Sequence, residues 1–149
     1  SDVVHKVLLK YRSYLLDERI SVQVNSLEKI IYTDEKWLIF IISQIIQNSI
    51  KYMDKKEKKI EITARENKDN VLLIIKDNGC GIKKSDLVRV FEKGFTGSDR
   101  TKSKSTGIGL YLAKNICNKL GLEITITSKY QEWTKVQIVY PKSNFNKMN

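Results

Sequence analysis

The feature that most constrains the fold is a long apolar segment at residues 33–52. Its apolar side chains recur with helical spacing, and Thr33, Asp34 and Glu35 supply the cap and acidic first turn that favour a helix start. One face of this helix consists of Leu38, Ile42, Ile45, Ile46 and Ser49. We therefore expect a long helix that buries one face and exposes the other.

Alternating apolar and polar residues predict a sheet around this helix. We expect strands at residues 20–24, 59–65, 71–76, 122–128 and 134–140, and a short extended stretch at 29–32. The run at 71–76 is apolar without alternation, so it is expected to be central and covered on both faces.

Further helices are expected at residues 3–17, 85–91 and 106–120, the last ended by a left-handed cap at Gly121. The order of the elements predicts an α+β two-layer sandwich, in which a mixed, mostly antiparallel sheet packs helices on one face. A length of 149 residues corresponds to one domain. Residues 142–149 are expected to form a disordered tail.

The composition narrows the class of ligand. The 27 basic and 17 acidic residues give a net charge of +10, which favours an anionic partner such as nucleic acid, a membrane surface or a phosphorylated ligand. Most of the excess is lysine scattered along the chain, as on a solvated surface.

The longest apolar run is broken by Ser43-Gln44, well short of the roughly 20 residues of a membrane span, and the first residues do not resemble a signal peptide. We therefore expect a soluble fragment.

The first candidate motif is a polar stripe on the long helix. At helical spacing, Gln44, Asn48 and Lys51 lie within about 60° of one another. Amide oxygens suit a hard cation and an ammonium group suits a phosphate. The alternative is a solvent-facing stripe on an amphipathic helix.

The second candidate motif is Asp77-Asn78-Gly79-Cys80-Gly81-Ile82, directly after the expected central strand. An aspartate at a strand end can accept a hydrogen bond from an exocyclic amine, and the glycines let the backbone pass close to a flat ring. The alternative is a hairpin turn, for which Asn-Gly is the common signal. The helix expected at 85–91 argues against it, because no partner strand returns.

The third candidate motif is Thr106-Gly107-Ile108-Gly109-Leu110, at the start of a helix and after a basic loop. Free backbone N–H groups and the positive end of the helix dipole make such a start an anion site. The motif is neither a Walker loop nor a dinucleotide fingerprint. A flexible linker over residues 94–107 is the alternative.

Together these motifs resemble the ATP-binding domain of bacterial sensor histidine kinases, within the histidine-kinase and gyrase-type superfamily. Gln44 to Tyr52 resembles the N box of that superfamily, Asp77 to Gly81 its G1 box, and Thr106 to Leu110 its G2 box. Residues 90–95 resemble its F box, although Lys93-Gly94 stands where many members carry a proline. The stretch at 91–97 resembles the branch that responds to cell-envelope antibiotics such as bacitracin and antimicrobial peptides. The fold that the resemblance implies is the Bergerat type.

The resemblance implies a role for each motif. Asp77 would bind the adenine amino group, with Gly79 and Gly81 beneath the ring. Asn48 would ligate Mg²⁺, and Lys51 would meet the phosphates of ATP; both are catalytic candidates. The remaining candidates for nucleotide binding are Gln44, Tyr52, Ile82, Phe91, Phe95, Thr106, Gly107, Ile108, Gly109 and Leu110.

The resemblance also implies partners that the sequence does not contain. The phosphate would pass to a histidine on a separate dimerisation domain, and then to a response regulator. His5, followed by Lys6-Val7, does not fit the phosphoacceptor pattern, so little self-phosphorylation is expected. Residues 1–18 would be the tail of a linker helix and 19–141 the catalytic domain, on the cytoplasmic side of a membrane-anchored homodimer that binds no nucleic acid. The alternatives are an anti-sigma-type serine kinase and a basic nucleic-acid-binding module.

Overall fold

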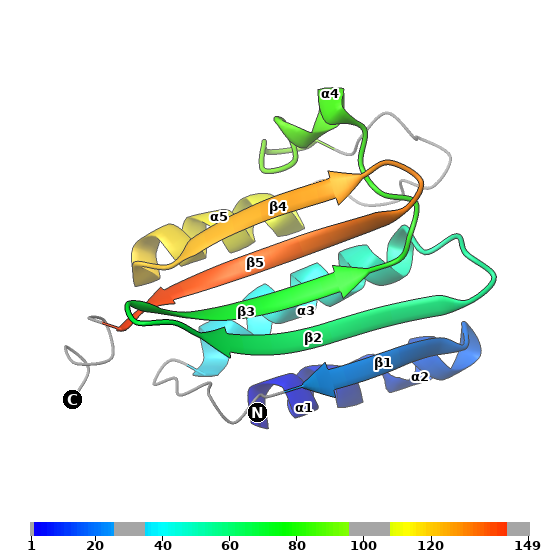
Figure 1. Ribbon diagram of the computed structural model, residues 1–149, viewed down its shortest axis with the longest axis horizontal. Helices are drawn as coiled ribbons and strands as arrows, with labels where there is room; N and C mark the ends of the chain where they lie inside the picture. The colour runs from blue at the N-terminus through cyan, green and yellow to red at the C-terminus, as the bar shows by residue number, and fades with distance from the viewer. Residues whose placement is uncertain (1, 26–34, 96–107, 143–149) are drawn as a thin grey trace.

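The computed structural model describes residues 2–25, 35–95 and 108–142, and in them one sheet is covered on one face by helices (Figure 1). The predicted two-layer α+β sandwich is thereby confirmed. The helices are α1 (Asp2–Lys10), α2 (Arg12–Asp17), α3 (Glu35–Lys51), α4 (Lys84–Leu87) and α5 (Gly109–Leu120). The strands are β1 (Ile20–Asn25), β2 (Lys58–Glu66), β3 (Asn70–Asp77), β4 (Glu123–Lys129) and β5 (Trp133–Pro141).

The sheet is mixed and mostly antiparallel, as predicted. Its strand order is β1-β2-β3-β5-β4, with β3 in the centre. Only the β1–β2 pair among the described strands is parallel. The register of β3 brings its last residue, Asp77, opposite Ile60 of β2 and Thr134 of β5. The polar end of β3 is therefore flanked by a strand on each side.

The core lies between the sheet and α3. The predicted apolar face of the long helix is buried, and Leu38, Ile42 and Ile46 are fully excluded from solvent. The strands alternate, so that Ile60 and Ile62 of β2 point into the same layer. Each such side chain contributes about 1.5–3 kcal/mol relative to exposure. This packing fixes α3 against the sheet, and with it the polar stripe on the other side of the helix.

The prediction that the central strand is covered on both faces was wrong. Burial in β3 alternates, and Leu72 and Ile74 are only half-buried. The helices α3 and α5 lie on the same side of the sheet (Figure 1). The outward side chains of β3 are therefore shielded mainly by neighbouring strands, where Val139 and Gln137 of β5 lie in register with them.

Several helix boundaries differ from expectation. The helix predicted at 3–17 is broken at Tyr11 into α1 and α2, and the helix predicted at 85–91 is the shorter α4 followed by turns. The helix predicted from Thr106 begins at Gly109, and Gly121 ends it with a φ of 73°, as predicted. The stretch expected at 29–32 lies outside the described residues. Of the expected tail, Lys142 is described, and its N–H donates to the Asp69 carbonyl.

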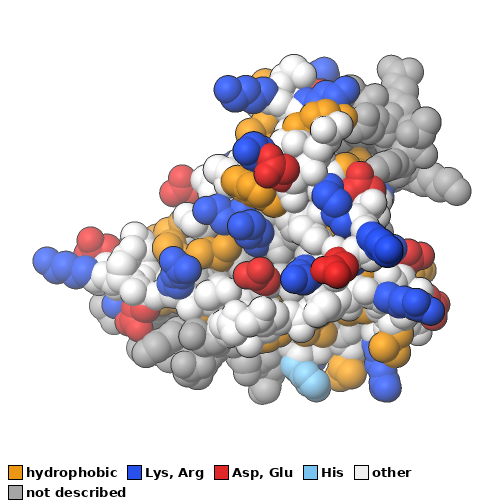
Figure 2. All heavy atoms as spheres, turned by 45° about the vertical axis from the view of Figure 1, so that its right-hand side comes forward, with side chains coloured by type: hydrophobic (Ala, Val, Ile, Leu, Met, Phe, Trp, Pro, Cys, Tyr) orange, Lys and Arg blue, Asp and Glu red, His pale blue; other side chains and the backbone are white. Residues whose placement is uncertain are grey.

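Figure 2 shows lysine and arginine side chains interspersed with acidic ones on the visible face, without a single basic block. Each of the described helices falls short of the length and apolar character needed to cross a membrane.

Candidate functional site

Asp77, the last residue of β3, is the centre of the candidate site. Its side chain is 7% exposed, and Oδ1 accepts a hydrogen bond from the Gly79 N–H at 2.9 Å. The Ser49 hydroxyl of α3 also bonds to the carboxylate. A strand, a loop and a helix therefore meet at this acid.

Burial raises the pKa of the Asp77 carboxyl above its ordinary value of 3.8, because the charged form loses hydration. The hydrogen bonds from Gly79 and Ser49 and the charge of Lys55 act in the opposite direction without cancelling the effect. An ionisable group kept at such a cost is typical of a functional site.

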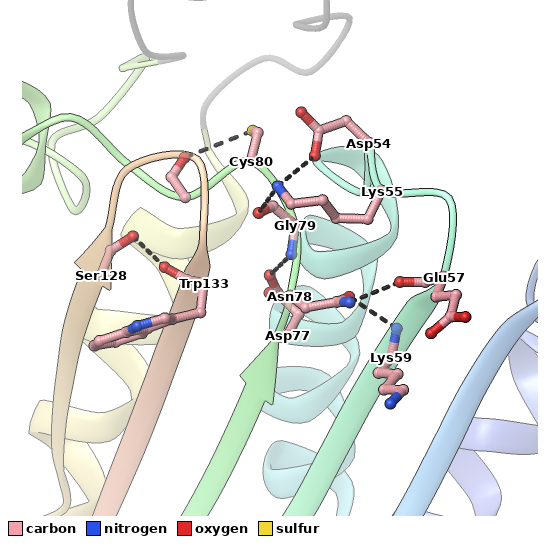
Figure 3. Close-up of polar contacts among 11 residues, drawn as sticks. Asp54, Lys55, Glu57, Lys59, Asp77, Asn78, Gly79, Cys80, Ser128 and Trp133 are labelled. Atoms are coloured by element: carbon pink, nitrogen blue, oxygen red, sulfur yellow. Dashed lines mark hydrogen bonds and ion pairs between the residues drawn. The ribbon is translucent and has the colours of Figure 1, made fainter.

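The loop after Asp77 is fastened to β2 through Asn78. The Asn78 Oδ1 accepts from the Lys59 N–H at 2.8 Å, and its Nδ2 donates to the Glu57 carbonyl at 2.7 Å (Figure 3). The chain then continues into α4 instead of a returning strand. The hairpin alternative for Asn78-Gly79 is therefore wrong.

Both glycines of this loop are required by its packing against the protein itself. A Cβ on Gly79 would lie 2.6 Å from the Tyr52 carbonyl oxygen. Gly81 has a φ of 70°, and its Cβ would lie 2.4 Å from the Lys129 carbonyl oxygen. Close approach to a flat ring was the expected reason for these glycines, and close approach to neighbouring backbone is a second one.

The polar stripe of α3 lies beside this loop. The Cys80 N–H donates to the Tyr52 carbonyl at 2.9 Å, so the end of α3 and the loop are joined. Gln44, Asn48 and Lys51 are partly exposed, on the side of the helix away from the core. The first and second motifs, which are 25 or more residues apart in sequence, are therefore neighbours in the fold.

Two members of the stripe have distinctive surroundings. Partial burial lowers the pKa of Lys51, whose Nζ lies 5.1 Å from the centre of the Tyr52 ring. An anion beside Lys51 would favour its charged form. Asn48 is partly exposed on the same helix, and no hydrogen bond joins its side chain to another of the described residues. Amide oxygen is a ligand type that Mg²⁺ accepts, and the residues present therefore fit a nucleotide-bound magnesium ion.

The third motif reaches the stripe through Gly109, the first residue of α5. A Cβ there would lie 2.2 Å from the Gln44 Oε1, so the glycine leaves room for the Gln44 side chain. Ile108 stands at the N-cap without a side-chain cap, and Leu110 is half-buried. Thr106 and Gly107 lie outside the described residues.

The aromatic residues of the segment 90–95, which resembles the F box, pack against other parts of the protein. Phe91 packs against the core, and the Lys114 Nζ of α5 lies 5.4 Å from its ring centre. Phe95 is half-buried, with the Arg89 guanidinium 4.7 Å from its ring centre. Residues 96–107, most of the basic loop that precedes the third motif, lie outside the described residues.

Sequence reasoning missed two residues that hold the loop at 77–82 and a third that lies beside its first residue. The Lys55 Nζ donates to the Gly79 carbonyl at 3.1 Å. The Ser128 Oγ accepts from the Ile82 N–H at 2.7 Å, and buried Thr134 lies opposite Asp77. None of the three stands in a recognisable motif. Only the alternation in 134–140 carried a signal, because it predicted Thr134 at the start of a strand.

Comparison with known proteins identifies the family. Residues 33–144 match the family described as histidine kinase-, DNA gyrase B- and HSP90-like ATPases. The chain belongs to this family. The resemblance drawn from the four motifs is thus confirmed, and the serine-kinase and nucleic-acid alternatives are not favoured.

The curated proteins to which this chain is most clearly similar include bacterial sensor kinases. It is 41% identical over 115 residues to the sensor protein kinase GraS of Staphylococcus aureus strain JH1, and 39% identical to GraS of strain MRSA252. These alignments cover 76% of this chain and 33% of each relative. The chain therefore spans about a third of the length of the curated relatives it matches. The similarity to GraS agrees with the narrower branch expected from residues 91–97.

Solved structures of histidine kinases share the fold. The catalytic domain of histidine kinase ThkA superposes with a TM-score of 0.79 at 18% identity, covering 95% of this chain and 92% of that one. The mycobacterial sensor histidine kinase MprB gives 0.76 at 20% identity, covering 94% and 93%. At these identities the likeness shows the architecture alone.

Proposed function

We propose that this chain is the ATP- and Mg²⁺-binding catalytic domain of a two-component sensor histidine kinase. In this role it binds ATP and delivers the γ-phosphate to a histidine on a separate dimerisation domain. One observation carries the proposal: a buried carboxylate, Asp77, sits where β3, the glycine loop and the polar helix α3 meet. Family membership supports the same activity.

Asp77 recognises the base. A buried carboxylate with unused acceptor capacity is costly unless a donor meets it, and the exocyclic amine of adenine is such a donor. Guanine presents a carbonyl oxygen at the corresponding ring position, which a carboxylate repels. The backbone at Gly79, Gly81 and Ile82 forms one wall of the base site, and Tyr52 borders it.

The stripe on α3 and the start of α5 handle the phosphates. Lys51 brings a positive charge, which a phosphate stabilises, and the N–H groups at Ile108, Gly109 and Leu110 face the anion at the positive end of the helix dipole. Asn48 holds Mg²⁺, assisted by Gln44, and the ion neutralises charge on the phosphates when bound. Thr106 and Gly107 belong to the same phosphate-binding segment, and Phe91 and Phe95 anchor the segment before it.

The remaining partners follow from the longer relatives. We propose residues 1–18 as the tail of a linker helix, 19–141 as the catalytic domain and 142–149 as a tail. The whole protein is then a membrane-anchored homodimer with this domain on the cytoplasmic side, a response regulator as its phosphate acceptor, and no nucleic-acid ligand. His5 is exposed on α1, and its sequence context does not match a phosphoacceptor.

Calorimetric titration with ATP in the presence of Mg²⁺ tests this function. Asp77→Asn keeps the shape of the side chain and an oxygen for the Gly79 N–H, but it presents a donor to the adenine amine. Because a hydrogen bond to a charged group contributes about 1.5–3 kcal/mol, we expect the affinity for ATP to fall at least about tenfold. The matched control is Asp69→Asn, an exposed acid in the β2–β3 turn, which should bind as the wild type does. Equal affinities for Asp77→Asn and wild type would contradict the assignment.

A further inference from the structure

The turn between β4 and β5 packs against the loop that follows Asp77. The Gln131 N–H donates to the Cys80 carbonyl, and Gly81 lies so close to the turn that its Cβ would be 2.9 Å from the Tyr130 Cα. Gln131 itself has a positive φ of 69°, which is uncommon for a non-glycine residue but occurs in short hairpin turns. The hydrogen bond and the close approach at Gly81 join the turn directly to the loop.

Ser128, the second-to-last residue of β4, bonds to both the loop and β5. Its Oγ donates to the Trp133 carbonyl at 2.7 Å and accepts from the Ile82 N–H at 2.7 Å. The Thr134 Oγ1 lies 3.1 Å from the same oxygen. Because a hydroxyl has a single hydrogen, the bond to Trp133 commits that hydrogen to β5 and leaves the lone pairs for Ile82 and Thr134.

The loop at 77–82 is thus held from three sides. Asn78 fastens it to β2, and the Tyr52 carbonyl and Lys55 fasten its middle to the end of α3. Ser128 and the Gln131 N–H fasten its last residues to the β4–β5 turn. Ile82, held by Ser128, lies at the opposite end of the loop from Asp77. The Ser128 bond therefore fixes the direction in which the loop leaves the acid.

We propose that Ser128 is a positioning residue for nucleotide binding, acting through the Ile82 N–H to hold the base-binding loop in its binding geometry. The inference rests on the proposed role of that loop. A loop that is already ordered pays less conformational entropy when the base binds. Loss of the hydroxyl leaves the Ile82 N–H without its acceptor. The loop is then ordered only when ATP binds, and the entropy lost in ordering it lowers the affinity for ATP.

A matched pair of substitutions isolates the hydroxyl. Ser128→Thr and Ser128→Val have nearly the same shape and the same strand propensity, and only threonine keeps the hydroxyl. For ATP binding measured by calorimetry, we expect Ser128→Val to weaken the affinity about tenfold, the equivalent of one buried hydrogen bond, and Ser128→Thr to stay within about twofold of wild type. Thr127→Val, at an exposed neighbouring position on β4, should bind as the wild type does.

Amide hydrogen exchange of the nucleotide-free protein supplies a readout specific to the contact. We expect the Ile82 N–H to exchange faster in Ser128→Val than in Ser128→Thr, while amides in the middle of β4 stay protected in both. Equal ATP affinities of wild type and Ser128→Val would overturn the proposal while leaving the function intact. Equal losses in the two Ser128 variants would also overturn it, because shape and not the hydroxyl would then matter. Failure of the wild type to bind ATP would instead remove the proposed function on which it rests.

Discussion

At the scale of single residues, the site depends on one acid kept where acids are unfavourable. Asp77 is buried at the end of β3, and the hydrogen bonds and charge around it do not restore the ordinary pKa of its carboxyl. Such a residue costs folding free energy when ionised, and a bound adenine amine would recover part of that cost. The acid is therefore better explained by binding than by stability.

The pH dependence of the stability of the nucleotide-free protein tests whether ionised Asp77 destabilises the fold. The pKa of Asp77 is higher in the folded state than in the unfolded chain, so the folded state binds this proton more tightly. The contribution of Asp77 to stability therefore falls as pH rises from about 3.8 through the folded-state pKa. Asp77→Asn has no carboxyl group and does not lose stability in this way. We therefore expect the melting temperature of Asp77→Asn relative to wild type to increase between acidic and neutral pH, as measured by thermal denaturation at a series of pH values. A difference that shrinks as pH rises would contradict the raised pKa.

The residues proposed to contact the nucleotide were predictable from the sequence, whereas the residues that support them were not. Asp77, Asn48 and Lys51 were singled out as polar residues after an apolar strand and along an apolar helix, and the resemblance to histidine-kinase ATP-binding domains supplied their predicted roles. Ser128 was not singled out, because a serine in an alternating strand is unremarkable and its partner, Ile82, lies 46 residues away. The supporting contacts depend on tertiary packing, which local spacing does not record.

At the scale of elements, α3 is the common support of the site. Its apolar face packs on the sheet, its C-terminal end bonds to the Cys80 N–H, and its middle meets α5 where Gln44 lies against Gly109. The existence of α3 and of the strands was predictable from periodicity. The coverage of β3 was not, because an apolar run does not reveal whether helices lie on both faces of a sheet or on one.

A double-mutant cycle tests the contact between α3 and α5. A Cβ at position 109 would overlap the far end of the flexible Gln44 side chain, which must then move aside, so Gly109→Ala should stabilise the wild-type background less than the better helix propensity of alanine alone would. In a Gln44→Ala background the same change should be more stabilising, which gives a coupling of about 0.5–1 kcal/mol in urea denaturation. Gln47→Ala, at an exposed position of α3, is the matched control background. An equal effect of Gly109→Ala in all three backgrounds would exclude the contact.

At the scale of the whole molecule, the fold gathers three features that are separated along the chain. The sheet orders β3 beside β5, and α3 lies behind it, so the acid, the polar stripe and the start of α5 share one end of the molecule. The chain covers about a third of its sensor-kinase relatives, and its proposed task is correspondingly the nucleotide-dependent part of a larger reaction. The net charge is +10, and on the face that Figure 2 shows the basic side chains are interspersed with acidic ones rather than gathered in one block.

The central claim is that a purine nucleotide binds between the Asp77 loop and the stripe of α3. Titration of the ¹⁵N-labelled protein with ADP and Mg²⁺, followed through its backbone amide resonances, tests this most directly. We expect saturable shifts that are largest at Gly79, Gly81 and Asn48. Shifts confined to the open face of the sheet, around Ile74 and Gln137, or no saturable shift, would contradict the account.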